Sequence, residues 1–417
     1  MRLTVVLVAL TACASNTGAP TQNVEPEEPD LTTERKLPGE LASFAATLVH
    51  ANNQFACDLY AELASQPGNH VFSPFSIATA LAMTDAGAAG DTDAELRAAL
   101  HLTLPADRGH ATFGALLDSL DRGRSQQLYT LTTANGVFSQ IGSPLVPGFT
   151  QTLTTDYAAT TTQVDFLANP GAARTQINTW VAHQTETKIR TLFGPDQITD
   201  QTRLVLANAI LFKGAWRHQF DPARTTAKSF QLATGETVDV PTMYKSDDIA
   251  TLAITGGVLG ILPFRGKDLS LVIALPDQAG GLPAVEAQLT ADAIADWMSR
   301  ALPAEFRPVE LPKFSLSSAP DLGPILQHLG ITSAFDPTTA DFSNIDGTRN
   351  LYVQTVAHQA VIDVTEDGAE AAAATGVGAG VGSAPTPFVA DHPFVFFLYD
   401  HVTGEVLFLG RVTDPRP

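Results

Sequence analysis

The segment "EDGAEAAAATGVGAGVGSAPTPF", Glu366 to Phe388, constrains the fold more than any other part of this 417-residue chain. Between Ala369 and Gly382 it contains one charge and no proline. If alternate residues are taken from Ala369, one set is small or apolar throughout, and the other set holds the charge and all the glycines. This period of two is typical of a strand with one buried face.

The same segment is a poor strand by itself, because each glycine costs about 0.5–1 kcal/mol in lost chain entropy. It can therefore lie in solvent as a loop, and it can also enter a sheet, since no side chain is too large or too charged to be covered. Pro385 and Pro387 cannot donate to a sheet ladder and limit any such strand. We predict a segment with two possible states; a flexible Ala/Gly loop with accidental alternation is the alternative.

The charge of the chain excludes one class of partner. The net charge is −20, and the sequence has no cluster of Lys and Arg that could neutralise phosphates or sulfates. We therefore expect no binding to nucleic acid or to heparin-like polymers.

The chain is long enough to bury a large core, and no linker is visible after about residue 41. This favours a single domain over residues 41–417, with a two-domain layout as the alternative.

The N-terminus, "MRLTVVLVALTACASN", has the order of a secretory signal: a cation, a short apolar run and small residues ending at Cys13. The stretch from Leu10 to Cys13 resembles the lipobox of bacterial lipoproteins, in which the cysteine is lipidated. We expect a signal peptide at 1–12 and a lipid-anchored, disordered tether at 13–40. The protein would then be exported, either to a bacterial cell envelope as a lipoprotein or as a secreted protein. An ordinary signal peptide with a chance cysteine is the alternative.

Helical and strand-like patterns are both present along the chain. Helical spacing covers 49–65, 73–88, 91–102 and 172–189, and strand-like runs cover 202–212, 269–276, 309–317, 350–366 and 394–412, the last as a hairpin around 402–404. Ser73 is a natural N-cap before Pro74, and Thr92 with Glu95 has the spacing of a capping box. Cys57 lies at a helical apolar position and is expected to be buried. The order of elements indicates an α+β protein with large sheets.

Motifs for catalysis and for cofactors are absent from the sequence. There is no GxSxG elbow, HExxH helix, P-loop or paired CxxC, and the ten histidines lack metal-ligand spacing. The glycines at 376–382 are followed by prolines rather than a helix, which argues against a dinucleotide site. Ser73, Asp165 and His358 could be imagined as a triad, but nothing in the sequence brings them together. We predict no catalytic residue, no metal and no cofactor.

From about residue 41 to its C-terminus the chain resembles the serpin family. The resemblance is carried, in the family's order and spacing, by "NHVFSPFSIATALAMTDAGAAGDTDAEL", "TTANGVFSQ", "LANAILFKGAWRHQFDPARTTAKSF", "VPTMY", "LPFRGKDLSLVIALP", "FDPTTADFSNI", "VAHQAVIDVTEDGAEAAAATG" and "DHPFVFFLYDHVTGEVLFLGRV". It implies a serpin fold of three β-sheets with eight or nine helices and an exposed reactive-centre loop.

The resemblance also implies a mechanism. A serine protease, or a cysteine protease, cleaves the loop and forms an acyl-enzyme, and the loop then inserts into the main sheet as a strand and traps the protease. This insertion is a recognised case of β-strand addition driven by stored strain. The chain would act as a monomeric inhibitor and not as an enzyme. A non-inhibitory serpin that binds or stores a ligand is the alternative.

Site residues follow from the resemblance position by position. The hinge comprises Glu366, Gly368, Ala369, Glu370, Ala371, Ala372, Ala373, Ala374 and Thr375. Ala369 departs from the threonine that is usual in the family, but alanine is uncharged and fits within a sheet, so insertion should survive. The polar cluster beneath the opening sheet, called the shutter, comprises Ser73, Ser76, Asn208 and His358. Trp216 matches the tryptophan at the breach, where the loop first enters, and simple core packing is compatible with the same residue.

The cleaved bond is placed by the usual spacing of inhibitory members. Counting forward from the hinge, or backward from His392, gives Gly382–Ser383. Val381 and Ala384 on either side are small and apolar, so cleavage after Val381 is an alternative. Such residues suit a protease with a shallow apolar pocket, of elastase-like or subtilisin-like type.

Overall fold

The computed structural model describes residues 37, 39–125, 129–369 and 386–416. These described residues form one compact unit. Within the described ranges there are ten α-helices and three sheets, so the α+β class is confirmed, with helices slightly more numerous than the resemblance implied. The helices are α1 Gly39–Ala64, α2 Pro74–Asp85, α3 Gly90–Ala99, α4 Ala106–Ser125, α5 Pro147–Tyr157, α6 Pro170–Gln184, α7 Leu282–Glu286, α8 Ala291–Arg300, α9 Leu322–His328 and α10 Ser343–Asp346.

The largest sheet has nine strands and provides much of the core. Its order is β1-β15-β14-β8-β7-β6-β9-β13, with β5 paired to β6. The strands β8 and β14 lie near its middle and are buried at every position, which explains why their sequences are apolar apart from Ser270 and Asp400. The bounds are β1 His70–Phe72, β5 Thr226–Gln231, β6 Thr237–Ile254, β7 Gly257–Pro263, β8 Leu269–Pro276, β9 Glu305–Pro312, β13 Phe388–Val389, β14 Phe394–Asp400 and β15 Val406–Val412.

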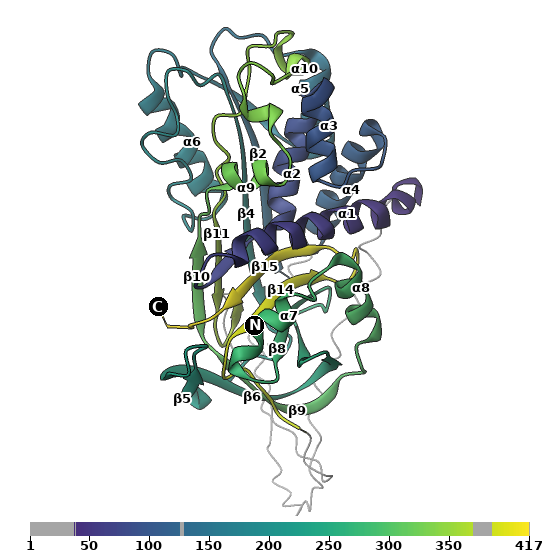
Figure 1. Cartoon of the computed structure of the whole chain (residues 1–417), viewed down its shortest axis with the longest axis vertical. Helices are drawn as coiled ribbons and strands as arrows, with labels where there is room; N and C mark the ends of the chain where they lie inside the picture. The colour runs from purple at the N-terminus through teal and green to yellow at the C-terminus, as the bar shows by residue number, and fades with distance from the viewer. Residues whose placement is uncertain (1–36, 38, 126–128, 370–385, 417) are drawn as a thin grey trace, which may run out of the picture. The chain divides into compact units, whose positions relative to one another are not determined.

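Two smaller sheets lie side by side (Figure 1). One has the order β12-β4-β2-β3, and the other pairs β10 with β11. Throughout the described residues, no ladder joins β4 to β11. We call the boundary between β4 and residues 351–364 the slot. The bounds are β2 Tyr129–Gln140, β3 Thr160–Val164, β4 Leu204–Ala215, β10 Phe314–Ser318, β11 Ala360–Val364 and β12 Gly368–Ala369.

The strand predicted over 350–366 forms only in part. Strand β11 covers 360–364, whereas residues 351–359 have no ladder partner. These residues face β4 across a cavity of about 130 Å³, which is lined by Leu204, Leu206, Tyr352 and Thr355 among others. A strand needs a paired neighbour to satisfy its backbone groups, and here the neighbouring edge is too far away to bond.

The helix α2 lies between β4 and β15 and is buried on nearly all sides. It begins as the sequence predicts: the Ser73 side chain caps it by accepting from the Ser76 N–H, and Pro74 occupies its first turn. This start places two serine side chains directly beneath the slot. The hairpin predicted over 394–412 is also confirmed, as the antiparallel pair β14–β15.

The predicted capping box at Thr92 and Glu95 is wrong. Helix α3 begins at Gly90 after Ala89 without a side-chain cap, so Thr92 is already inside it. Its hydroxyl instead accepts from the backbone of Asp341, and the Glu95 carboxylate accepts bonds from the backbone and hydroxyl groups of Thr332 and Ser333. Both side chains form hydrogen bonds with residues distant in the sequence, and the local sequence pattern could not reveal these bonds.

Cys57 is buried on α1, as predicted, and burial raises the pKa of its thiol to about 12. A thiol with such a pKa is almost never the reactive thiolate at neutral pH, so Cys57 acts as a packing residue.

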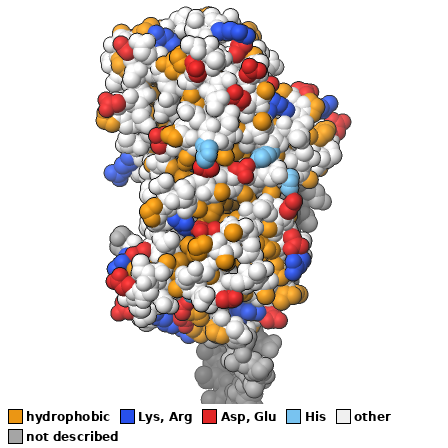
Figure 2. Space-filling view, viewed as in Figure 1, with side chains coloured by type: hydrophobic (Ala, Val, Ile, Leu, Met, Phe, Trp, Pro, Cys, Tyr) orange, Lys and Arg blue, Asp and Glu red, His pale blue; other side chains and the backbone are white. Residues whose placement is uncertain are grey.

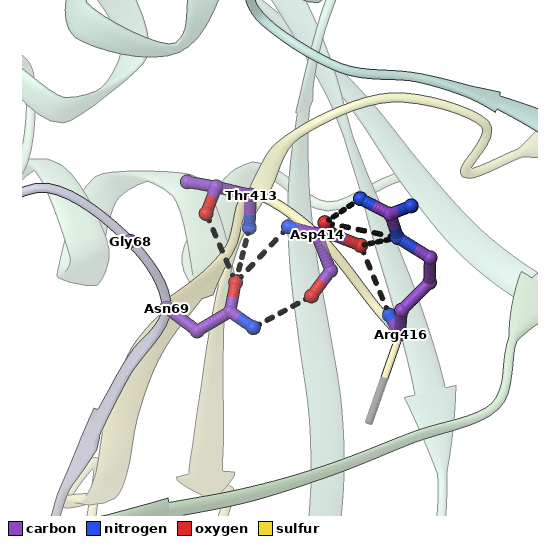
Figure 3. A pocket seen from close by; sticks show the side chains of 5 residues that line it. All are labelled: Gly68, Asn69, Thr413, Asp414 and Arg416. Carbon is purple, nitrogen blue, oxygen red and sulfur yellow. Dashed lines mark hydrogen bonds and ion pairs between the residues drawn. The ribbon is translucent and has the colours of Figure 1, made fainter. Parts of the chain in front are cut away.

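The C-terminal segment after β15 is anchored to the turn that follows α1 (Figure 3). The Asn69 side-chain oxygen accepts bonds from the backbone N–H of Thr413 at 2.7 Å and of Asp414 at 3.0 Å, and its amide donates to the Asp414 carbonyl at 2.6 Å. A shallow hollow beside these bonds is lined by the same residues with Gly68 and Arg416. The end of the chain is thus held by side-chain bonds in addition to its ladder.

Candidate functional site

A chain of buried polar side chains runs beneath the slot and joins β15, α2, β4 and β2. The Ser73 hydroxyl donates to the Leu407 carbonyl at 2.6 Å and accepts from the Ser76 N–H. The Ser76 hydroxyl donates to the Asn208 side-chain oxygen, and the Asn208 amide donates to Asn135 at 2.7 Å. Because unpaired polar groups are costly in an interior, these groups depend on one another for partners.

His358 connects the other side of the slot to the same cluster. Its Nε2 accepts a bond from the backbone N–H of Ser73 at 3.1 Å, so the proton of the neutral ring must lie on Nδ1. Burial lowers the pKa of His358 to about 4. If the ring were protonated, the N–H at Nε2 would face the backbone N–H of Ser73, and the hydrogen bond to the start of α2 would be lost. The structure therefore brings all four predicted shutter residues together.

The meeting of Ser73 and His358 does not create a catalytic pair. The imidazole accepts from the backbone of Ser73, while the hydroxyl donates to a carbonyl and makes no bond to the ring. Asp165 accepts instead from the backbone of Ala168 at 3.0 Å. A nucleophile needs a base bonded to its own hydroxyl, and that bond is missing here.

Trp216 lies at one end of the slot, where β11 turns into β12. Its ring stacks on Phe264 with centroids 4.6 Å apart and contacts the Phe220 ring edge-on. Its Nε1 donates to the Thr365 carbonyl at 2.9 Å, and its backbone N–H donates to the Asp367 carbonyl at 3.1 Å. Trp216 is thus more than a packing residue, because it holds the turn at which the hinge begins.

Glu366 in this turn is fixed by two polar contacts. One carboxylate oxygen lies 2.7 Å from Lys313 Nζ, and the other accepts from the Thr225 hydroxyl at 2.7 Å. Burial by itself would raise the pKa of Glu366, but these two partners outweigh it and the net shift is downward. The start of the predicted hinge is therefore bonded to the residue before β5 and to the residue between β9 and β10.

Gly368 occupies a position that only glycine fits. Its φ is +126°, and a Cβ there would lie 2.1 Å from the Gly214 carbonyl oxygen. This close approach lets Gly368 and Ala369 pair antiparallel with Ala215 and Gly214 at the edge of β4. The first hinge residues thus already run along the slot as the short strand β12.

Several predicted site residues lie outside the described residues: Glu370, Ala371, Ala372, Ala373, Ala374 and Thr375 of the hinge, Val381, Gly382, Ser383 and Ala384 around the reactive bond, and Cys13. Sequence reasoning missed Asn135, Lys313 and Thr225. A weak signal for Asn135 was present, because asparagine is unusual inside a strand-like stretch such as "LTTANGVF". Nothing local marks Lys313 or Thr225, whose role depends on contacts across the fold.

Two negative findings concern the described ranges alone. They contain no group of three or more His, Cys, Asp or Glu side chains placed to hold a metal ion. No helix in them is both long and apolar enough to cross a bilayer.

Comparison with known proteins identifies the fold. Residues 50–415 match the family model described as "Serpin (serine protease inhibitor)". The chain belongs to the serpin family. Leukocyte elastase inhibitor from cattle is 39% identical over 376 residues, covering 88% of this chain and 98% of that protein. The predicted serpin fold is confirmed, and the family assigns the chain to the protease inhibitors rather than to the enzymes.

Solved serpin structures agree with this assignment. Serpin48 of the insect Tenebrio molitor has a TM-score of 0.78 at 32% identity, covering 88% of this chain and 98% of its own. Human thyroxine-binding globulin, solved with thyroxine bound, has a TM-score of 0.81 at 29% identity, covering 89% of this chain and all of its own. These relatives come from animals, so the bacterial origin expected from the N-terminus stays a prediction.

We predict that His358→Gln removes a pH dependence from the stability of the intact chain. The unfolded chain takes up a proton near pH 6.5, whereas folded His358 takes one up only near pH 4. The stability that neutral His358 contributes is therefore fully present above pH 6.5. It is lost as the pH falls from 6.5 to about 4, by about 3 kcal/mol at most. Glutamine can still accept the Ser73 N–H but does not titrate.

Urea unfolding of both forms between pH 7.5 and pH 4.5 measures this effect. All other acid-titrating groups are common to the two proteins, so the difference between the curves isolates His358. Curves that stay parallel over the whole range would contradict the prediction.

Proposed function

We propose that this serpin inhibits an elastase-like or subtilisin-like serine protease as a suicide substrate, through cleavage at Gly382–Ser383. After cleavage, residues 369–382 would enter the slot as a strand between β4 and β11. The observation that carries this proposal is the pairing of Gly368 and Ala369 with β4 at the entrance of the slot. Beyond that pair, the edge of β4 in the described part of the chain carries no other strand.

The C-terminal fragment must remain attached when this bond is cut. Residues 383–417 would then have no covalent link to the remainder. They include β14, which pairs with both β8 and β15, and the segment bonded to Asn69. Strand pairing on both sides and burial at every position of β14 support retention of the fragment in the inhibited complex.

The choice of target class rests on the small side chains at the proposed bond. Glycine and valine fit a shallow apolar pocket, and the absence of Arg or Lys nearby disfavours trypsin-like proteases. The name of the cattle relative, an inhibitor of leukocyte elastase, is consistent with this choice.

On the visible face, acidic and basic side chains are interspersed (Figure 2), which supports our expectation that heparin-like polymers play no part.

The central test is incubation of the intact chain with elastase and with subtilisin. We expect a covalent complex that survives SDS. Because SDS removes the non-covalently held C-terminal fragment, the mass of the complex should equal protease plus chain minus that fragment. Mass spectrometry of the released fragment identifies the bond and distinguishes Gly382–Ser383 from Val381–Gly382. The cleaved chain should melt at a higher temperature than the intact one, because a strand has been added to the sheet.

The alternative is a serpin that binds or stores a ligand without inhibiting; the thyroxine complex of one relative shows that a serpin can bind a small ligand. Clean cleavage with no trapped protease, and an unchanged melting temperature after cleavage, would favour this alternative.

The proposed bond makes a specific prediction for Gly382→Arg. An arginine immediately before the cleaved bond fills the deep acidic pocket of trypsin, so the variant should form SDS-stable complexes with trypsin that the parent chain does not form. Gly382→Ala is the matched control, because it changes the same position without adding a charge and should still trap elastase. If Gly382→Arg gains no activity toward trypsin, the bond has been placed wrongly.

We also propose that the chain is exported and anchored through a lipid on Cys13. The support is the order of charge, apolar run and small residues before Cys13. In a bacterial host that lipidates exported proteins, Cys13→Ser should move the chain from the membrane fraction to the soluble fraction. Cys57→Ala is the control and should leave the partition unchanged, because that thiol is buried. An unmodified chain found only in the soluble fraction would contradict the anchor.

A further inference from the structure

The turn that follows α6 is bonded to both sides of the slot. The carboxylate of Glu186 lies 2.9 Å from Nζ of Lys213, which belongs to β4. Two residues later, Nζ of Lys188 lies 3.0 Å from the carboxylate of Asp363, which belongs to β11. The two ion pairs have opposite polarity, and together they connect strands that share no ladder in the described residues.

The turn itself is held in a fixed conformation. Glu186 and Thr187 have φ values of +48° and +65°, a left-handed geometry that non-glycine residues seldom adopt. The backbone N–H of Thr187 donates to the Ala182 carbonyl at 2.7 Å, and the N–H of Ile189 donates to the Thr185 hydroxyl at 3.2 Å. These bonds present the two charged side chains from a rigid base, so their pairs resist separation of β4 from β11.

Three of the four charged groups are partly shielded from solvent. The side-chain exposures are 20% for Lys213, 31% for Lys188 and 29% for Asp363, while Glu186 is more exposed at 57%. Burial alone would raise the pKa of Asp363, but a hydrogen bond from Ser315 and the ion pair with Lys188 lower it, so this carboxylate is charged at neutral pH. Partly shielded pairs are screened less by salt than fully exposed ones.

Insertion of a strand requires these pairs to break. A new strand between β4 and β11 needs the space of one strand, about 4.8 Å on each side. A turn bonded to β4 at 2.9 Å and to β11 at 3.0 Å cannot keep both contacts as the strands move apart. Breaking at least one pair is therefore part of the barrier to insertion.

We propose that Glu186 and Lys188 form an ionic strap across the slot, and that this strap sets the rate at which the cleaved loop inserts. The inference rests on the proposed inhibitory function and adds the residues that regulate it. These are positioning residues, because they touch neither the protease nor the cleaved bond. The strap prolongs the life of the intact form and slows trapping after cleavage.

The test uses the full chain with Lys188→Gln, Asp363→Asn, the double variant, and the charge swap Lys188→Asp with Asp363→Lys. Loop insertion is followed without a target protease, by cutting the loop with a metalloprotease and recording the gain in thermal stability over time. Trapping is followed separately, as the moles of inhibitor consumed per mole of elastase inhibited. Arg300→Gln, which removes a pair with Asp296 on α8, is the matched control.

We expect each single variant to insert its loop roughly two- to five-fold faster than the parent chain, and to consume less inhibitor per protease trapped. The double variant should match the single variants, since both singles remove the same pair. The charge swap should move the rate back toward that of the parent chain. One molar salt should accelerate the parent chain more than the double variant, which keeps only the Glu186–Lys213 pair. Arg300→Gln should behave as the parent.

Two outcomes overturn the strap while the proposed function stands: insertion by Lys188→Gln at the parent rate, or equal acceleration by Arg300→Gln. A folded charge-swap protein that inserts as fast as the double variant also overturns it. If the parent chain itself gains no stability after cleavage and traps no elastase, the proposed function fails first, and the strap fails with it.

Discussion

The outer edge of β4 is the constraint on which the rest of this structure depends. One edge of β4 pairs with β2 along its length, but the other pairs only with the two residues of β12 where the structure describes the chain. A buried strand edge leaves backbone groups without partners, which is costly. The fold tolerates this edge, and the Ala/Gly segment that follows β12 has the composition to cover it. In the intact state, a favourable strand pairing along this edge of β4 has therefore not yet formed.

Three sets of polar contacts hold the elements around the slot in place. Beneath the slot, Ser73 links α2 to β15 and to His358. At the entrance of the slot, Glu366 forms an ion pair with Lys313, and the Trp216 side chain donates a hydrogen bond to the Thr365 carbonyl. Across it, the turn after α6 is bound to both β4 and β11. These are hydrogen bonds and ion pairs rather than apolar packing, so they can break and re-form at modest cost when the strands move.

Predictions from the sequence succeeded where neighbours along the chain determine the structure. The cap at Ser73 with Pro74, the β14–β15 hairpin and the burial of Cys57 all follow from local patterns. The resemblance to serpins then indicated which polar residues would meet. The capping box predicted at Thr92 was wrong, because the Thr92 hydroxyl accepts a hydrogen bond from the backbone N–H of Asp341, far along the chain.

The sequence by itself determined the family and the α+β class. It also predicts a C-terminal segment able to exist both in solvent and in a sheet, because alternation, glycine content and charge are properties of the chain. Only the tertiary structure decided that residues 351–359 stay unpaired opposite β4, that Asn135 completes the shutter, and that Lys188 reaches Asp363. Each of these depends on a distance between segments remote along the chain. Such distances are set by how the sheets and helices pack together, and no local pattern of residues records them.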